Sequence, residues 1–182
     1  MNHTRSLYWQ YPPLYTGDEI KELNKKILDH VLVDHKDEPA NVVKTAVVKV
    51  IQASLIKELD LMRDSIIRAN EENFGYNIYP GKLNMNYNVY SHKNKSEYDY
   101  HLDMAFANPA SDIKLTAILN LSTESYTGGD FCLRSSNELQ VPEIDKPGGL
   151  IIFPSFILHR VTPVTQGTRI TLSAWITGPK FQ

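Results

Sequence analysis

The chain has 182 residues, a formal net charge of −2 and 42% hydrophobic residues, which is typical of one compact globular domain. Its 19 basic and 21 acidic side chains nearly balance, which excludes the strong basic field used in non-specific nucleic-acid binding. The single cysteine, Cys132, excludes an internal disulfide framework and a cysteine-based zinc site. The first residues lack the apolar stretch of a signal peptide, and no apolar run spans a bilayer. We therefore expect one cytoplasmic domain over residues 1–182, with neither a membrane nor a nucleic-acid partner.

The first half of the chain is expected to be mainly helical. Residues 1–15 are predicted to form an extended lead-in, and Thr16 and Glu19 then form a capping box, which is typical of a helix start. Apolar residues recur at helical spacing in two segments, and Gly75 lies just beyond the end of the second. The predicted elements are a helix over 18–33, a polar break over 35–41, a strand over 42–51 and a helix over 54–73. Together they form a helical support over about residues 16–75.

From residue 80 onward the hydrophobic period changes to two, which predicts half-buried strands. The predicted strands are 83–90, 98–104, 113–121, 130–134, 149–153, 157–162 and 168–177. Short strands in series, separated by segments rich in Gly, Pro, Asn and Asp, indicate a sandwich or barrel. Because the helices come first, we expect them to pack on one face of a barrel core that covers about residues 80–177.

His101 and Asp103 form a His-x-Asp pair on a strand-like segment, and His159 lies on a later one. Strand side chains alternate between two faces, so His101 and Asp103 are expected on the same face. With a distant histidine they would form the set of two His and one carboxylate that is typical of non-haem Fe(II) oxygenases. A lone half-buried histidine is more often structural, and His-x-Asp recurs by chance. One chance match, His35 and Asp37, lies in the polar break and is interpreted as a decoy.

The last long strand carries a candidate anion-binding residue, Arg169. One face of this strand is polar with one aromatic side chain, and the other is apolar; the two sets are Arg169, Thr171, Ser173 and Trp175, then Ile170, Leu172, Ala174 and Ile176. An arginine inside a barrel requires an anion, and its guanidinium fits a carboxylate with two hydrogen bonds. By the same alternation, Tyr90 is predicted to reach the cavity from the strand over 83–90. The alternatives are a surface ion pair for Arg169 and ordinary packing for Tyr90 and Trp175.

Three segments carry a resemblance to a known family: YDYHLDM, YTGGDF and KPGGLIIFPSFILHRVTPVTQGTRITLSAW. The chain resembles the Fe(II)/2-oxoglutarate-dependent dioxygenases, in particular the prolyl 4-hydroxylase-like branch and its PKHD-type bacterial relatives. The resemblance implies a double-stranded β-helix, a jelly-roll, cupin-like core. It implies iron bound by His101, Asp103 and His159. It further implies 2-oxoglutarate bound by Arg169, with Tyr90 and Trp175 beside it.

The implied activity is hydroxylation of a C–H bond with O2 and 2-oxoglutarate, releasing succinate and CO2, with ascorbate as a candidate reductant. A protein or peptide side chain, with proline first, is the expected substrate. Prolyl 4-hydroxylases often carry Lys where this chain has Arg169, which favours the bacterial and sensor-type relatives. The alternatives are the same chemistry on a small molecule such as a free amino acid, and a cupin-like metal-binding protein without catalysis. The polar loop at 93–97 is either a lid over the substrate or an ordinary solvated loop.

Overall fold

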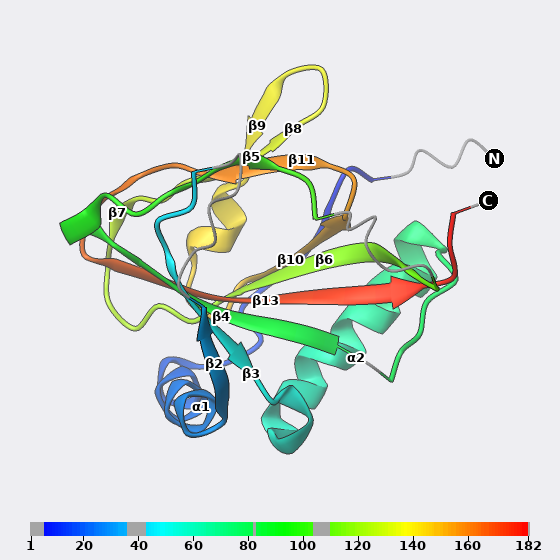
Figure 1. Cartoon of the computed structure of the whole chain (residues 1–182), viewed down its shortest axis with the longest axis horizontal. Helices are drawn as coiled ribbons and strands as arrows, with labels where there is room; N and C mark the ends of the chain where they lie inside the picture. Colours follow the sequence, from blue (N-terminus) through cyan, green and yellow to red (C-terminus); the bar gives the residue numbers. More distant parts are fainter. Residues whose placement is uncertain (1–5, 36–42, 82, 104–109, 182) are drawn as a thin grey trace.

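The computed structural model describes residues 6–35, 43–81, 83–103 and 110–181, and these form two facing antiparallel sheets with helices on one side (Figure 1). The large sheet has the strand order β1-β10-β6-β13-β4-β3-β2, and the small sheet has the order β5-β11-β8-β9. Strands β12 and β7 form a separate pair. This mainly β architecture with N-terminal helices confirms the predicted fold class.

The helices and strands have the following bounds. The large sheet contains β1 (Trp9–Tyr11), β2 (Val31–His35), β3 (Val47–Ile51), β4 (Leu83–Ser91), β6 (Asp112–Asn120), β10 (Leu150–Pro154) and β13 (Thr168–Gly178). The small sheet contains β5 (Tyr98–His101), β8 (Phe131–Arg134), β9 (Glu138–Gln140) and β11 (Leu158–Val161), and the separate pair is β7 (Thr127–Gly128) with β12 (Val164–Gln166). The two α-helices are α1 (Gly17–Asp29) and α2 (Asp60–Ala69).

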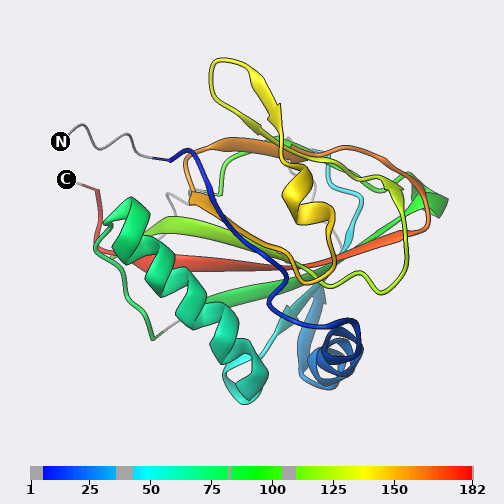
Figure 2. The ribbon, with the colours of Figure 1, turned by 180° about the vertical axis from the view of Figure 1, so that it is seen from behind.

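Both helices cover the outer face of the large sheet, as the two opposite views show (Figures 1 and 2). The apolar stripe of α1 and that of α2 share one core with the apolar face of β13; this core includes Ile20, Leu23, Ile27, Met62, Ile66, Leu172, Ala174 and Ile176. The predicted packing of the helices on one face is therefore confirmed.

None of the helices in the described part of the chain has the length and apolar character to span a membrane.

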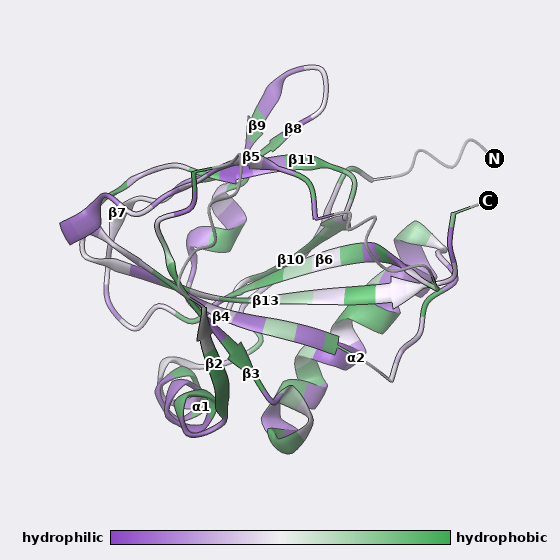
Figure 3. Ribbon diagram, viewed as in Figure 1, coloured by the Kyte–Doolittle hydropathy of each residue, from purple (hydrophilic) through white to green (hydrophobic). Residues whose placement is uncertain are grey.

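The inner face of the large sheet and the small sheet enclose a second core. Alternation along β4 is visible as hydrophilic and hydrophobic residues in turn (Figure 3). Met85 and Tyr87 belong to the helix-side core, whereas Tyr90 packs with Phe131, Phe153 and other residues between the sheets. The period of two thus divides each central strand between the two cores.

Several predicted boundaries were wrong, and sheet pairing explains the first of them. The helix over 18–33 ends as α1 at Asp29, and Val31 begins β2, which pairs with β3. Val31 and Val33 are β-branched, so sheet pairing outweighs the helical spacing of the apolar residues. The lead-in, predicted to be extended, contains the short strand β1, which pairs with β10.

Other predicted segments are shorter or divided. The strand over 42–51 is reduced to β3, and Lys44 makes an isolated bridge with Tyr98. The helix over 54–73 is divided into two 3₁₀ turns, α2 and a π turn over Asn70–Phe74. Gly75 ends that turn with φ of 68°, as its position beyond the helix indicated. Strand β5 ends at His101, so Asp103 lies beyond the strand.

The remaining predicted strands correspond to β4, β6, β8, β10, β11 and β13, with small shifts at their ends. Strands β7, β9 and β12 were not predicted. Asp37 of the decoy pair lies outside the described residues.

Candidate functional site

Three candidate ligands meet between the two sheets. His101 is the last residue of β5 and lies directly opposite His159 in the antiparallel pairing of β5 with β11. Asp103 follows two residues later, and its backbone N–H donates to the carbonyl of Ser155 at 3.1 Å. The backbone therefore returns the carboxylate to the two imidazoles even though the strand has ended.

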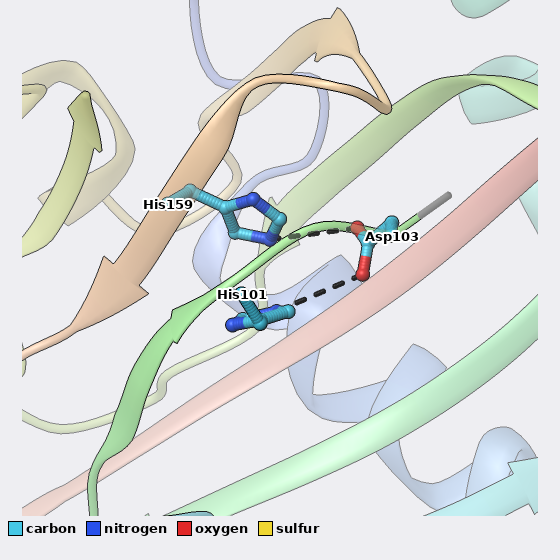
Figure 4. Close-up of side chains that lie close together, drawn as sticks. All are labelled: His101, Asp103 and His159. Carbon is cyan, nitrogen blue, oxygen red and sulfur yellow. Dashed lines mark ion pairs between the residues drawn. The ribbon is translucent and has the colours of Figure 1, made fainter. Parts of the chain in front are cut away.

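The ligand atoms point toward one another (Figure 4). The distance from His101 Nε2 to Asp103 Oδ1 is 3.6 Å, and that from His159 Nε2 to Asp103 Oδ2 is 3.4 Å. Ligand atoms that share one ion at about 2.1 Å lie roughly 3–4 Å apart, so this spacing suits a divalent metal ion. In the described residues these three form the one His, Cys or carboxylate cluster with such spacing.

Both histidines are held in the tautomer that a metal requires. Nδ1 of His101 hydrogen-bonds the carbonyl of Asp99 at 2.8 Å, and Nδ1 of His159 hydrogen-bonds that of Ile157 at 2.9 Å. When Nδ1 carries the proton, the Nε2 lone pair is free to bind a metal. Burial, and then the nearby His159, lower the pKa of His101 to about 4, which keeps its ring neutral at pH 7.

The carboxylate of Asp103 has its own partner, which sequence reasoning missed. The hydroxyl of Thr116 on β6 donates to Asp103 Oδ2 at 2.7 Å. The side chain of Asp103 is 10% exposed, so this bond fixes its orientation with little competition from water. A threonine thirteen residues after Asp103 in the chain carries no local signal for this role.

Aromatic side chains surround the two imidazoles. The Tyr98 ring stacks on His101 with centroids 3.5 Å apart, and Phe153 meets His159 edge-on at 4.8 Å. Lys44 places its Nζ 4.4 Å from the centroid of Tyr98. Tyr98 and Lys44 line the same small cavity as the three candidate ligands, and sequence reasoning missed both.

The polar faces of β4 and β13 reach this cavity, as predicted from their alternation. Asn88 and Tyr90 line it from β4, and Ser173 and Trp175 line it from β13. Nε1 of Trp175 is buried and has no hydrogen-bond partner among the described residues. Burial raises the pKa of Tyr90 to about 12, so its phenol remains a neutral donor.

Arg169 is buried at 1% exposure and lies opposite Tyr90 in the pairing of β13 with β4. Its guanidinium carbon is 5.3 Å from the centroid of the Tyr90 ring. Arg169 does not itself line the cavity, which corrects the expectation that its whole strand face would do so. Its Nε and Nη2 have no hydrogen-bond partner among the described residues. Unpaired buried donors on a charged group are costly, so this site suits an anion.

A glycine turn makes room for Arg169. A Cβ at Gly129 would lie 2.9 Å from Cδ of Arg169, and Gly129 has φ of 69°. Tyr126, in the same turn, lies 3.7 Å from that Cβ position and accepts a hydrogen bond from Asn120 at 3.3 Å. Burial raises the pKa of Tyr126, and the positive charge of Arg169 opposes the rise. The segment YTGGDF thus forms the surroundings of Arg169.

The loop at 93–97 does not have the structure of an untethered lid. Ser96 is 2% exposed, its hydroxyl donates to the carbonyl of Thr45, and its own carbonyl accepts from Val164. Cys132 is buried.

The chain is similar to known oxygenases in sequence and in fold. Residues 85–177 match the 2OG-Fe(II) oxygenase superfamily. A PKHD-type hydroxylase from Acaryochloris marina is 38% identical over 80 residues, which are 43% of this chain and 36% of that protein. Another, from Teredinibacter turnerae, is 35% identical over 105 residues, or 54% of this chain and 43% of that protein. The chain therefore spans less than half the length of these curated relatives.

A crystal structure of a Pseudomonas putida prolyl-4-hydroxylase has the same fold. It superposes with a TM-score of 0.71 at 17% identity, over 97% of this chain and 95% of the other. The superfamily match covers more than half of the chain and includes all three candidate metal ligands. The chain belongs to the 2OG-Fe(II) oxygenase superfamily.

Proposed function

We propose that this protein is an Fe(II)- and 2-oxoglutarate-dependent dioxygenase that hydroxylates a C–H bond on a protein or peptide side chain. The observation that carries the proposal is the convergence of His101, Asp103 and His159 in one cavity with Tyr90, beside the buried Arg169. A protein that only stores metal requires the first three residues. It has no use for a buried guanidinium such as that of Arg169, two nitrogens of which lack a partner in the described ranges.

The donor set fits iron. Two imidazole nitrogens and one carboxylate bind one side of an ion and leave positions open, as in non-haem Fe(II) oxygenases. Iron held there would supply the chemistry that couples oxidative decarboxylation of 2-oxoglutarate to insertion of oxygen into a C–H bond. The chain itself orients the ligands through Thr116, Asp99 and Ile157, and keeps water away with its aromatic wall.

The cosubstrate is bound by Arg169 in this proposal. A guanidinium pairs with a carboxylate through two charged hydrogen bonds, and Nε and Nη2 of Arg169 are donors that have no partner within the described part of the chain. Tyr90, with its phenol neutral, is placed to add a third donor. Trp175 presents its indole N–H, which has no partner in the part of the chain that the structure describes, from the cavity wall. Ascorbate is proposed only as a reductant that keeps the iron in the Fe(II) state.

A peptide substrate is supported by the fold of the Pseudomonas putida protein, which is a prolyl-4-hydroxylase. Proline is therefore the first candidate for hydroxylation. A free amino acid or another small molecule is the alternative substrate, because specificity resides in loops rather than in the barrel.

The test is release of succinate from 2-oxoglutarate with Fe(II), O2 and ascorbate, followed by a search for a 16-Da mass increase in a peptide library. His101→Ala and Asp103→Ala should abolish succinate release. The control variant Arg63→Gln lies on α2, outside the cavity, and should retain it. If the protein binds Fe(II) but the wild type never forms succinate, the metal-storage alternative replaces this proposal. Succinate formation with modification of free amino acids alone would assign a small-molecule substrate.

A further inference from the structure

A cluster of four side chains lies on the outer face of the small sheet, behind the candidate iron ligands. Its members are Tyr100 on β5, Arg134 on β8, Glu138 on β9 and Arg160 on β11, and we name it the outer clamp. Tyr100 directly precedes His101, and Arg160 directly follows His159. Because strand side chains alternate, the clamp residues point away from the cavity that their neighbours enter.

The contacts of the clamp connect β5 and β11 through β9. The hydroxyl of Tyr100 donates to Oε2 of Glu138. Arg160 Nη2 lies 3.0 Å from Oε1 and 2.8 Å from Oε2 of the same carboxylate. Glu138 therefore bonds both to Tyr100, which precedes His101, and to Arg160, which follows His159.

Two guanidinium groups also face the Tyr100 ring. The guanidinium carbons of Arg160 and Arg134 are 5.0 Å and 5.2 Å from its centroid. Both distances are within the range in which a cation is attracted to an aromatic ring. The ring is thus held by a hydrogen bond at its hydroxyl and by two cations.

The backbone holds β5 least regularly at its end. Strand β5 has four residues and is the last strand of the small sheet; its start is also held from the other side, where Lys44 bridges Tyr98 and Asp99 donates its N–H to the carbonyl of Val43 at 2.9 Å. It pairs with β11 at His101 opposite His159 and at Tyr98 opposite Val161, with a register shift between the two pairs. Tyr100 falls in this irregular part, and β5 ends at the next residue. Side-chain contacts at Tyr100 therefore act where the ladder is least regular.

We propose that Tyr100, Glu138 and Arg160 are positioning residues that keep His101 opposite His159 and so preorganise the metal site. This inference rests on the proposed function, because it requires that the three ligands bind a metal. Without the clamp, the end of β5 gains freedom, and the metal must restrict that freedom when it binds. Loss of the clamp should then weaken metal binding more than it weakens folding.

The competing interpretation is an ordinary surface ion-pair network. Glu138 and Arg160 are 42% and 33% exposed, and exposed ion pairs generally add little stability. The two interpretations differ in what they predict for metal affinity, because a surface pair without a positioning role leaves it unchanged.

The experiment is a titration of the metal-free protein with Co(II) alone, read by calorimetry and by the visible absorption of bound Co(II). Tyr100→Ala and Glu138→Gln should raise the Kd for Co(II) at least about fivefold, with a smaller rise for Tyr100→Phe, which keeps the ring. The matched control is Asp60→Asn, which breaks the comparably exposed Arg63–Asp60 pair on α2. It should leave the Kd unchanged. Thermal unfolding of each metal-free variant measures the effect on folding.

The proposal is overturned if Glu138→Gln and Tyr100→Phe bind Co(II) like the wild type, whatever their thermal stability. Because Glu138 is exposed, its variant keeps the test valid even if Tyr100→Ala fails to fold. Failure of the proposed function gives distinct results. A wild type that binds Co(II) but forms no succinate contradicts only the dioxygenase activity, and the variants still test the positioning role; a wild type that binds no Co(II) contradicts the metal site and the positioning role together.

Discussion

His101 and His159 make the same local hydrogen bond, each from Nδ1 to the backbone carbonyl two residues earlier in the chain. The two residues also lie opposite each other in the pairing of β5 with β11. The two strands thus present matched imidazoles, each with Nε2 directed toward the carboxylate of Asp103. Because each bond spans only two residues, the orientation of each ring is set by its own local backbone.

Replacement of Arg169 by glutamine should weaken binding of 2-oxoglutarate. The change removes a charged two-point contact with a carboxylate, which is worth about 1.5–3 kcal/mol, and the Kd should rise at least about tenfold. Calorimetry on the metal-loaded protein measures this Kd, with Arg63→Gln as the control for loss of one positive charge. An unchanged Kd in Arg169→Gln would place the anion site elsewhere.

Replacement of Thr116 by valine should weaken metal binding with little change in shape. Valine keeps the branched side chain but removes the hydroxyl that donates to Asp103 Oδ2. Loss of such a partner of a metal ligand typically costs about 10–100-fold in metal affinity. The measurement is Co(II) titration, with Thr171→Val, a buried residue of β13 outside the cavity, as the matched control. Equal affinities in the two variants would show that Thr116 does not orient the carboxylate.

Replacement of Lys44 by glutamine should strengthen binding of the metal ion alone. The positive charge of Lys44 is one of the causes that lower the pKa of His101, and it opposes a metal cation in the same way. Removal of this charge should therefore lower the Kd for Co(II) and weaken the dependence of that Kd on salt. Lys93→Gln, in the exposed turn after β4, is the control. A weaker affinity in Lys44→Gln would contradict this electrostatic role.

The stability of the metal-free protein should fall as the pH decreases from about 6.5 to 4. The folded-state pKa of His101 is lowered to about 4 from 6.5, chiefly by burial and then by His159. Below pH 6.5 the unfolded chain binds a proton that the folded chain does not, so protonation favours unfolding. The lowered pKa of His101 reduces the free energy of unfolding by about 3 kcal/mol at most, near pH 4.

Urea unfolding of the metal-free wild type and of His101→Gln at several pH values isolates this contribution. The free energy of unfolding should fall more steeply with decreasing pH in the wild type. Parallel curves would show that His101 is not the group responsible.

The sequence by itself determined the order of the two α-helices and of the main strands from β3 to β13, and the residue types that carry the chemistry. The period-two pattern of β4 and β13 is a local property, so it indicated that Tyr90, Ser173 and Trp175 share a cavity-facing side before any contact was known. The three candidate ligands were recognisable from a sequence pattern, because a His-x-Asp pair is followed by a histidine on a later predicted strand; they are His101, Asp103 and His159. Their roles as ligands remain predictions that metal binding will test.

Tertiary structure decided what depends on contacts between distant segments. Helix α1 ends at Asp29 because Val31 pairs with β3, which comes later in the chain. The approach of Thr116 to Asp103 and of Lys44 to Tyr98 depends on how the strands are brought together. No local pattern encodes such pairs, because each residue type is ordinary at its own position. The outer clamp is of the same kind, since Tyr100, Glu138 and Arg160 meet only when three strands are in register.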